Sequence, residues 1–358
     1  SNGGDRDRRS RLRSRIAVAT LPTAVPEVLA RYREPLERAL REAVGDEPPA
    51  LAAAARYVLG WEDEHGRPAH NAGKRIRPAL CLLGAEVAGG TVEDAMPGAC
   101  AVELVHNFSL VHDEVQDHDA ERHHRPTLWA LLGEAQAINA GDFLYTRAVQ
   151  AISDGPGDPG RRMAGLSVLN RAIQAMIGGQ WDDLDFERRE SVHVEEYLAM
   201  VAGKTGALLS APLEIGALLA GADAGFAAGL GAWGKQVGLA FQAQDDYLGT
   251  WGNPGDTGKS NSNDIARKKK TLPIVYGMDN ADARAAILGA YDAEGDVSAD
   301  AIARVVQALE VAGADTACRE MAAEYAHAAD ALLDGLGLPA ETRALLRDVA
   351  RYLVDRAG

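Results

Sequence analysis

The sequence predicts an all-α protein, and two features of its 358 residues indicate this. From about residue 23 onward, alanine and leucine abound and apolar residues recur at spacings of three and four, as in the stretch 166–176. Strand-length alternation of valine, isoleucine or threonine between turns is missing. Glycine, proline, asparagine and aspartate cluster at four predicted loops: Asp46–Pro49, Ser153–Gly160, Gly252–Asp264 and Gly335–Pro339.

One large helical domain is predicted for residues 23–358, because none of the four loops has the length of a domain linker and no repeat of 20–50 residues occurs. The preceding residues, 1–22, contain six arginines between Arg6 and Arg15 and almost no apolar side chains. They are predicted to form a disordered basic arm, with docking to another protein, a nucleic acid or a membrane surface as the minority alternative.

Composition excludes several classes of protein. The net charge of -15 argues against a nucleic-acid binder, because such binding depends on neutralising phosphates. No run of 18 apolar residues occurs, so no transmembrane segment is predicted. The three cysteines, Cys81, Cys100 and Cys318, form neither a disulfide framework nor a zinc pattern, and no signal peptide is evident, so a cytoplasmic location is expected.

Two acidic segments, 110–117 and 241–246, carry the functional prediction. Asp113 and Asp117 stand at i and i+4, which places their carboxylates on one helix face, about 6 Å apart along the axis. Acids on an ordinary solvated helix surface are the alternative for a single pair. The apolar residues before Asp113 and before Asp245 disfavour that alternative, since acids among apolar side chains are costly unless paired or metal-bound. Together the segments predict a site for Mg²⁺ and a diphosphate.

Three groups of cations accompany the acids, at 73–78, at Lys204–Gly206 and at 258–270. Each alone is compatible with a solvated or snorkelling position. Basic groups at a helix N-terminus are disfavoured by the helix dipole unless an anion lies there, which favours a diphosphate beside the first group. His106 precedes Asp113 by seven residues and therefore lies on nearly the same face, where it could donate to a second diphosphate.

Taken in order along the chain, these segments resemble the trans-isoprenyl diphosphate synthases, the polyprenyl synthetases of the all-α isoprenoid synthase fold. The resemblance covers nearly the whole chain past residue 23 and rests on five motifs. It implies a single large helical bundle around a central cavity, and a homodimer. It also implies a Mg²⁺-dependent prenyltransferase, with three ions, that condenses isopentenyl diphosphate with an allylic diphosphate.

The resemblance also implies a role for each matching residue. The metal ligands are Asp113, Glu114, Asp117, Asp245 and Asp246. The residues that assist departure of the diphosphate and stabilise the allylic cation are Lys204, Thr205, Gln242 and Arg122. The substrate-binding residues are Lys74, Arg77, His106, His123, Lys259, Lys269 and Phe108. Phe108 would form the floor of the product cavity, which predicts a C20 product with C15 as the runner-up.

Four positions depart from the family pattern. Glu114 stands for an aspartate, Arg122-His123 stands for a pair of arginines followed by His124 in place of glycine, and Gly249 replaces the last aspartate of the second motif. These departures keep two alternatives open: a class I terpene cyclase on the same fold, and a non-catalytic subunit of a heteromeric synthase. Lys74 and Arg77 speak against the cyclase, which needs no site for a second substrate.

Overall fold

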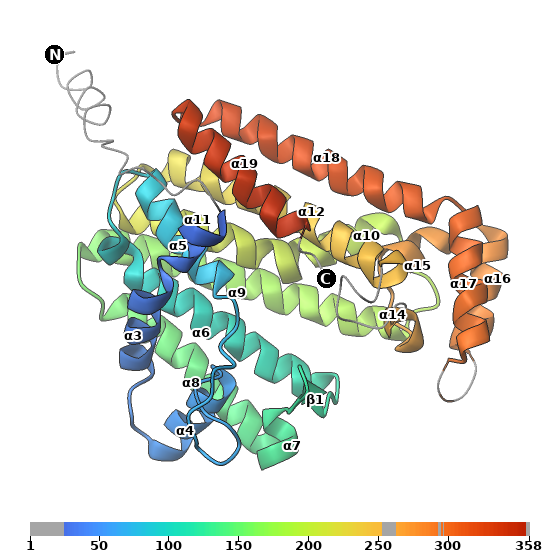
Figure 1. Ribbon diagram of the computed structural model, residues 1–358, viewed down its shortest axis with the longest axis horizontal. Coiled ribbons are helices and arrows are strands. Elements are labelled where there is room, and N and C mark those ends of the chain that lie inside the picture. The colour runs from blue at the N-terminus through green and yellow to red at the C-terminus, as the bar shows by residue number, and fades with distance from the viewer. Residues whose placement is uncertain (1–24, 253–262, 293–294, 296, 356–358) are drawn as a thin grey trace. The chain divides into compact units, whose positions relative to one another are not determined.

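The computed structural model describes residues 25–252, 263–292, 295 and 297–355, and it is helical almost throughout (Figure 1). The basic arm predicted for residues 1–22 lies outside the described residues, as does Lys259. The helices are α2 (Val25–Ala30), α3 (Arg33–Val44), α4 (Pro49–Val58), α5 (Ile76–Val87), α6 (Val92–Gln116), α7 (Leu128–Leu132), α8 (Glu134–Ser153), α9 (Pro159–Arg188), α10 (Val194–Val201), the π-helix η1 (Ala202–Gly206), α11 (Ala207–Leu219), α12 (Ala224–Trp251), α14 (Asn263–Ala266), α15 (Leu272–Gly277), α16 (Ala281–Tyr291), α17 (Ala299–Val311), α18 (Ala314–Gly335) and α19 (Ala340–Asp355). Two short strands, β1 (Glu121–Arg122) and β2 (Arg125–Pro126), pair antiparallel.

The predicted loops agree with the helix boundaries. The loops at 46–49, 153–160 and 335–339 separate α3 from α4, α8 from α9, and α18 from α19. At the fourth loop, α12 ends at Trp251 and α14 begins at Asn263, while residues 253–262 are outside the described part. The prediction of an all-α protein is confirmed.

The chain divides into two compact units. The first contains residues up to 170 together with 211–230, and the second contains 171–210 together with the residues from 231 onward. Helices α9, α11 and α12 therefore contribute residues to both units. The prediction of one domain from residue 23 onward stays a prediction.

In the first unit, α6 packs against α5 and α8 (Figure 1). Helix α6 begins with a capping box, in which the Thr91 hydroxyl accepts from the Asp94 backbone N–H and the Asp94 carboxylate accepts from the Thr91 backbone N–H. Leu104 on α6, Leu82 on α5 and Leu144 on α8 are fully buried. This packing fixes the C-terminal end of α6, which carries the first acidic segment.

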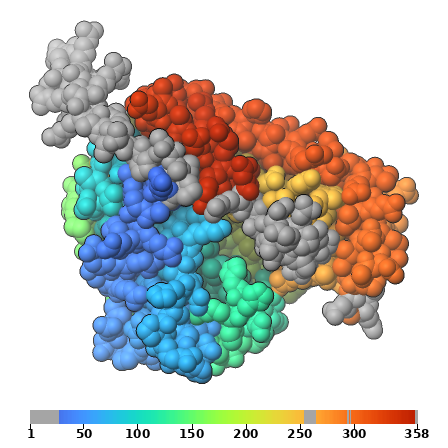
Figure 2. All heavy atoms as spheres, viewed as in Figure 1, coloured from blue at the N-terminus to red at the C-terminus, as the bar shows by residue number. Residues whose placement is uncertain are grey.

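In the second unit, one hydrophobic cluster joins α10, α12, α15 and α18. Tyr197 and Met200 of α10, Leu239 of α12, Val275 of α15 and Cys318 of α18 are all buried there. Helices α18 and α19 pack against each other, and the space-filling view shows them as one continuous red surface (Figure 2). The cluster surrounds the part of α12 that carries the second acidic segment.

The helical run Val194–Leu219, formed by α10, η1 and α11, has the length and mean hydropathy to cross a membrane, and half of its most apolar window is buried. Lys204 interrupts the apolar residues of this run, so it contains no 18 consecutive apolar residues. A core helix of a globular protein has the same composition, so the absence of a transmembrane segment stays a prediction.

Candidate functional site

The first acidic pair lies on the last turn of α6. Asp117 caps the helix, and its backbone N–H donates to the Asp113 carbonyl oxygen at 2.8 Å. Both side chains are half-buried, on the shared face that the spacing predicts. In the described part of the chain, no three histidine, cysteine or acidic side chains are placed to hold a metal by themselves. Mg²⁺ commonly takes one or two carboxylates and completes its coordination with water and substrate phosphate, so this donor pair fits it.

Glu114 does not share that face. Its carboxylate is buried and pairs with Arg122 Nε at 2.9 Å. Burial raises the pKa of Glu114 to about 6, against the opposing effect of Arg122. Successive helix residues point about 100° apart, which turns Glu114 away from Asp113 and toward the arginine. In the structure Glu114 is the partner of Arg122, and its role as a metal ligand stays a prediction.

The strands β1 and β2 form a hairpin whose two turn residues are His123 and His124. Both have positive φ, at 50° and 60°, as a type I′ turn requires. This geometry explains why glycine is usual at the second position, since it adopts positive φ without strain. The hairpin places Arg122, His123 and Arg125 on the wall of a cavity.

That cavity lies within the first unit and has a volume of about 340 Å³. One part of its wall is apolar, with Leu59, Leu110 and Leu128 among the lining residues. The rest is polar and contains both signs of charge. The charged and imidazole side chains along it are Arg75, Glu103, His106, Glu114, Arg122, His123 and Arg125.

Arg77 and His106 meet beside this cavity, with Arg77 Nη1 3.2 Å from His106 Nε2. Burial, together with the nearby Arg77, Arg122 and Arg75, lowers the pKa of His106 well below its usual range, so the ring is neutral at neutral pH. Lys74, the other cation predicted for this site, is exposed. The structure therefore places Arg77 next to His106. Lys74, three residues before Arg77, lies at the surface.

The second acidic segment lies on α12, where Asp245 is half-buried and Asp246 is fully inside the second unit. Asp246 accepts hydrogen bonds from the Tyr197 hydroxyl, from Gln242 Nε2 at 2.9 Å and from the Leu272 backbone N–H at 3.0 Å. Burial raises the pKa of Asp246 to about 7, although these three donors act in the opposite direction. Asp246 thus holds three neighbouring groups in place, and its role as a metal ligand stays a prediction.

Gln242 and Thr205, predicted to act together, are in contact. The Thr205 hydroxyl donates to Gln242 Oε1 at 3.0 Å. Because the Asp246 carboxylate is the partner on the other side, the NH₂ group of Gln242 must face Asp246 and its carbonyl oxygen must face Thr205. The orientation of the amide is thus set by Asp246.

Lys204 lies in η1, and its ammonium pairs with Asp183 of α9 at 2.6 Å. A π-helix is a wider turn than an α-helix and is frequent at functional sites. Close approach of α9 and η1 requires glycine on both sides: a Cβ on Gly179 would lie 2.5 Å from Lys204 N, and one on Gly203 would lie 2.6 Å from Ala175 O. The sequence did not predict Asp183 as a site residue. The glycines and acids around it, at 178–185, are the only local feature that could have indicated it.

The lysines that follow α12 are described only in part. Lys269 is half-buried, and its carbonyl oxygen accepts from the Tyr291 hydroxyl at 3.0 Å. Lys270 donates to the Phe186 carbonyl oxygen at 2.7 Å. At Gly249, where the family pattern has an aspartate, a Cβ would lie 2.8 Å from Asp264 Oδ2. The Asp264 carboxylate therefore lies where the side chain of an aspartate at position 249 would begin.

Phe108, predicted as the floor of the product cavity, is buried on α6. Its ring lies edge-on to His112 at 4.9 Å between centroids, and 5.7 Å from the ring of Tyr145 on α8. Its role in setting product length stays a prediction.

Arg75 differs in the structure from the other cations of the segment 73–78, with which its place in the sequence groups it. Arg75 is 5% exposed and is bound to two carboxylates, Glu37 and Glu103. No sequence signal distinguishes Arg75 from Lys74. The Arg75 side chain points inward because its backbone is left-handed, with φ 52°.

Comparison with known proteins identifies the family. The family model for polyprenyl synthetase matches residues 67–309. A (2E,6E)-farnesyl diphosphate synthase of Mycobacterium tuberculosis is 40% identical over 96% of this chain and 95% of its own length. A geranylgeranyl diphosphate synthase of the same organism is 39% identical over 86% of this chain and 88% of its own length.

Solved structures agree with this match. A polyprenyl synthetase from Streptomyces coelicolor A3(2) superposes with a TM-score of 0.86 at 37% identity, covering 92% of this chain and 99% of that one. A geranylgeranyl pyrophosphate synthetase from Pyrococcus horikoshii reaches a TM-score of 0.82 at 32% identity, covering 92% of this chain and 98% of that one. The predicted family and fold are confirmed by these matches. The chain belongs to the polyprenyl synthetase family of trans-prenyltransferases.

Proposed function

We propose that this enzyme condenses isopentenyl diphosphate with an allylic diphosphate to give a short-chain trans-prenyl diphosphate, C20 in length with C15 as the runner-up. The similarity to both a farnesyl and a geranylgeranyl diphosphate synthase supports the short-chain class. The observation that carries the proposal is the Arg77–His106 pair beside the cavity of the first unit.

That pair has the chemistry of an anion site. A guanidinium only donates hydrogen bonds, so His106 accepts on Nε2 and, being neutral, carries its proton on Nδ1. His106 Nδ1 and Arg77 Nε are both buried without a hydrogen-bond partner among the described residues. Two such donors are suited to a diphosphate oxygen, and buried polar groups are otherwise nearly always paired.

The pair also separates the competing functions. A cyclase acts on one diphosphate and has no use for a second anion site, whereas an elongating enzyme needs one. A non-catalytic subunit would need neither this site nor the acids Asp113 and Asp117. Elongation is therefore the function that accounts for the first unit as a whole.

The acidic residues would hold Mg²⁺, with Asp113, Asp117 and Asp245 as the ligands of three ions. When bound, Mg²⁺ supplies electrostatic stabilisation to the departing diphosphate. Lys204, now paired with Asp183, would offer its ammonium to that diphosphate. Thr205 and Gln242 would direct carbonyl dipoles at the allylic cation. The apolar helical walls would exclude water, which would otherwise capture the cation.

A homodimer in the cytoplasm is part of the proposal. Large apolar side chains are exposed on both units. They include Ile138 on α8 and Met163 on α9 in the first unit, and Ile177 and Trp181 on α9 in the second. Exposed apolar groups of this size are typical of protein interfaces. The three cysteines are free and buried, in keeping with a reducing compartment. Light scattering of the purified protein tests the dimer, and Trp181→Lys should weaken it.

A product assay tests the function. The purified protein is incubated with Mg²⁺, isopentenyl diphosphate and, in separate reactions, dimethylallyl, geranyl and farnesyl diphosphate, and the dephosphorylated alcohols are identified by mass. We expect a C20 alcohol from each starter. Hydrocarbon formed without isopentenyl diphosphate would identify a cyclase, and no product from any starter would leave only the subunit role.

A further inference from the structure

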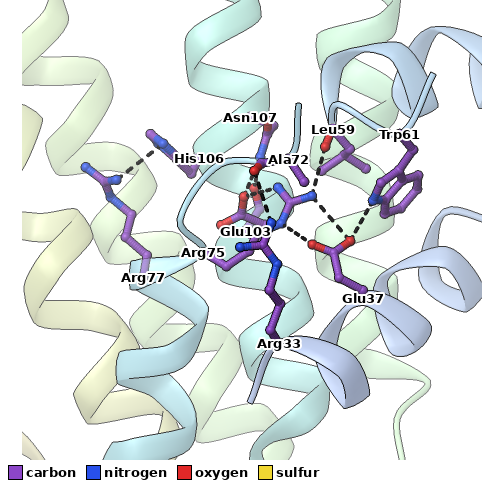
Figure 3. Close-up of polar contacts among 10 residues, drawn as sticks. All are labelled: Arg33, Glu37, Leu59, Trp61, Ala72, Arg75, Arg77, Glu103, His106 and Asn107. Atoms are coloured by element: carbon purple, nitrogen blue, oxygen red, sulfur yellow. Dashed lines mark hydrogen bonds and ion pairs between the residues drawn. The ribbon is translucent and has the colours of Figure 1, made fainter. Parts of the chain in front are cut away.

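Arg75 lies between Lys74 and Arg77, yet its side chain points into the first unit rather than toward solvent (Figure 3). All three guanidinium nitrogens are bonded. Nε donates to Glu37 Oε1 at 2.8 Å, Nη1 donates to Glu103 Oε1 at 2.6 Å, and Nη2 donates to the Leu59 carbonyl oxygen at 2.8 Å. One side chain thus joins α3, the end of α4 and α6.

The two carboxylates are fixed in turn by other residues. Trp61 Nε1 donates to Glu37 Oε2 at 2.6 Å. Asn107 Nδ2 donates to Glu103 Oε1 at 3.0 Å and to the Glu103 carbonyl oxygen at 2.8 Å. We refer to Glu37, Trp61, Arg75, Glu103 and Asn107 as the anchor cluster. In Figure 3 Glu37 and Glu103 approach the Arg75 guanidinium from α3 and α6, with Trp61 bonded to Glu37 and Asn107 bonded to Glu103.

The backbone at Arg75 shows that these bonds hold the chain in a specific conformation. Arg75 is the N-cap of α5 and adopts φ 52° and ψ 38°, the left-handed region that residues with a Cβ disfavour. Such a conformation persists only where the surroundings determine it. The bend leaves Lys74 exposed and directs the first turn of α5, with Arg77, toward His106.

The loop ahead of Lys74 is held by the same part of the protein. Asn71 N donates to the Gly60 carbonyl oxygen at 3.0 Å, and Arg33 Nη2 donates to the Ala72 carbonyl oxygen at 3.3 Å. A Cβ on Gly60 would lie 2.4 Å from the Asn71 carbonyl carbon, so the two segments are in contact. In the space-filling view α3, α4 and this loop form one continuous blue surface (Figure 2).

We propose that the anchor cluster positions the Gly73–Arg77 segment for the diphosphate of the second substrate, with Glu37 and Glu103 acting through Arg75 on the placement of Lys74 and Arg77. This inference rests on the proposed function for the identity of the substrate. Glu103 has a second effect, because its charge opposes the lowering of the Arg77 pKa by burial. The carboxylates of Glu37 and Glu103 thus lie beside the guanidinium groups of Arg75 and Arg77, of which only Glu103 and Arg75 are fully buried.

Stability alone is a weak explanation of this cluster. A buried ion pair often contributes no more than an apolar replacement of similar volume, because removing both charges from water is costly. A positioning role explains the cluster better, because a preformed anion site requires the Gly73–Arg77 segment to be held within a fraction of an ångström.

Glu37→Gln is the variant that tests the proposal, because it keeps the size of the side chain, removes its charge, and can accept from only one of the two donors, Arg75 Nε and Trp61 Nε1. The Glu37 side chain is 20% exposed, so the change is at the edge of the core. We expect the KM for isopentenyl diphosphate to rise by about tenfold, with kcat and the KM for the allylic diphosphate within about twofold of the parent. Glu62→Gln is the matched control, since Glu62 pairs with Arg56 Nε at 2.8 Å with a side chain that is 25% exposed.

A double-mutant cycle identifies the route of the effect. If Glu37 acts through the segment, Lys74→Ala should cost less in the Glu37→Gln background than in the parent. Additive effects, or an equal loss in every kinetic constant, would overturn the proposal. Should Glu37→Gln lose its helical circular dichroism, Glu37→Asp replaces it, with the same split between the two KM values expected.

A binding experiment separates this proposal from the proposed function. Inorganic diphosphate is titrated into the protein by calorimetry with EDTA present, so that binding does not depend on the acidic residues and Mg²⁺. We expect Glu37→Gln to bind about tenfold more weakly than the parent and Glu62→Gln to bind equally well. Equal affinity of the parent and Glu37→Gln overturns the positioning role even if prenyl products form. Absence of prenyl products refutes the proposed function alone.

Discussion

His106 accepts a hydrogen bond from Arg77 inside the first unit, with 3.2 Å between Nε2 and Nη1. This contact fixes both the charge and the tautomer of the ring, because a guanidinium cannot accept and its charge opposes protonation of the imidazole. From the sequence, His106 could be taken for one more basic residue near a diphosphate site. In the structure its ring is neutral, accepts on Nε2 and can donate from Nδ1.

The pH dependence of stability should report this neutral state. In the unfolded chain His106 titrates near the ordinary histidine pKa of about 6.5, whereas burial and Arg77 lower its pKa in the folded protein. Below about pH 6.5 the unfolded state binds a proton that the folded state does not, so stability is lost as the pH falls, by up to about 1.4 kcal/mol per unit. Urea unfolding between pH 5 and 8 should show a shallower loss for His106→Gln than for the parent. His65→Gln, at an exposed histidine, should match the parent, and an unchanged slope in His106→Gln would show that the ring is not held neutral.

The acidic pair on α6 has a matched control elsewhere in the chain. Asp330 and Asp334 on α18 have the same i, i+4 spacing, and both bond to Arg347 at 3.1 Å. We expect Asp113→Ala to lower kcat/KM by at least about 100-fold and to raise the Mg²⁺ concentration needed for half-maximal rate, because a ligand is lost. Asp330→Ala should leave both quantities unchanged. Normal turnover in Asp113→Ala would place the metal site elsewhere.

The neighbours Asp245 and Asp246 should give opposite results. Asp246→Ala removes the acceptor of three buried or partly buried donors and should cost about 3 kcal/mol or more of unfolding free energy, measured by chemical denaturation. Asp245→Ala should change that free energy by less than about 1 kcal/mol and should abolish turnover. Similar stability losses in the two variants would contradict the separation of roles.

His123 takes the place of an arginine on the cavity wall, and this predicts a pH-dependent substrate affinity. The KM for isopentenyl diphosphate should rise as the pH climbs through the range in which imidazoles lose their proton, since a positive charge is lost beside a diphosphate. His123→Arg should flatten that profile. His124→Arg is the control, because His124 shares the turn and does not line the cavity in the described part of the chain. Profiles that coincide for the parent and His123→Arg would rule out this role.

Phe108 and Phe143 are both buried aromatic residues of the first unit, on α6 and α8. Replacing either by alanine should cost about 3–5 kcal/mol of unfolding free energy. Only Phe108→Ala should lengthen the products seen by mass spectrometry, because only Phe108 is proposed as the floor of the product cavity. Unchanged product length in Phe108→Ala would assign the residue to packing alone.

The parts of the site that could be predicted from sequence are those determined by helix periodicity. Asp113 and Asp117 share a face because they are one turn apart on α6. The pairs Lys204–Asp183 and Arg75–Glu37 join residues 21 and 38 positions apart, so their contacts depend on packing that no local pattern encodes.

The partners of Glu114 and Asp246 could not be predicted for a related reason. Each is an acid next to a predicted metal ligand, and the sequence alone cannot show which of two adjacent carboxylates faces the site. That choice follows from a rotation of about 100° per residue about the helix axis. In the structure the rotation turns Glu114 to Arg122 and buries Asp246 among its donors.

The π-helix η1 has a consequence for sequence change in this protein. Ala207 N bonds to Ala202 O, five residues back, so the turn accommodates one residue more than an α-helix would in the same length. Deleting a single residue between 202 and 206 would let the segment close as ordinary α-helix and would leave the later side chains of α11 near their present direction relative to α10, because the turn already absorbs the extra residue. It would move the residues inside the turn, where Lys204 pairs with Asp183 and Thr205 bonds to Gln242. A one-residue deletion at this turn should therefore keep the helical packing of α10 and α11 and remove the contacts of Lys204 and Thr205.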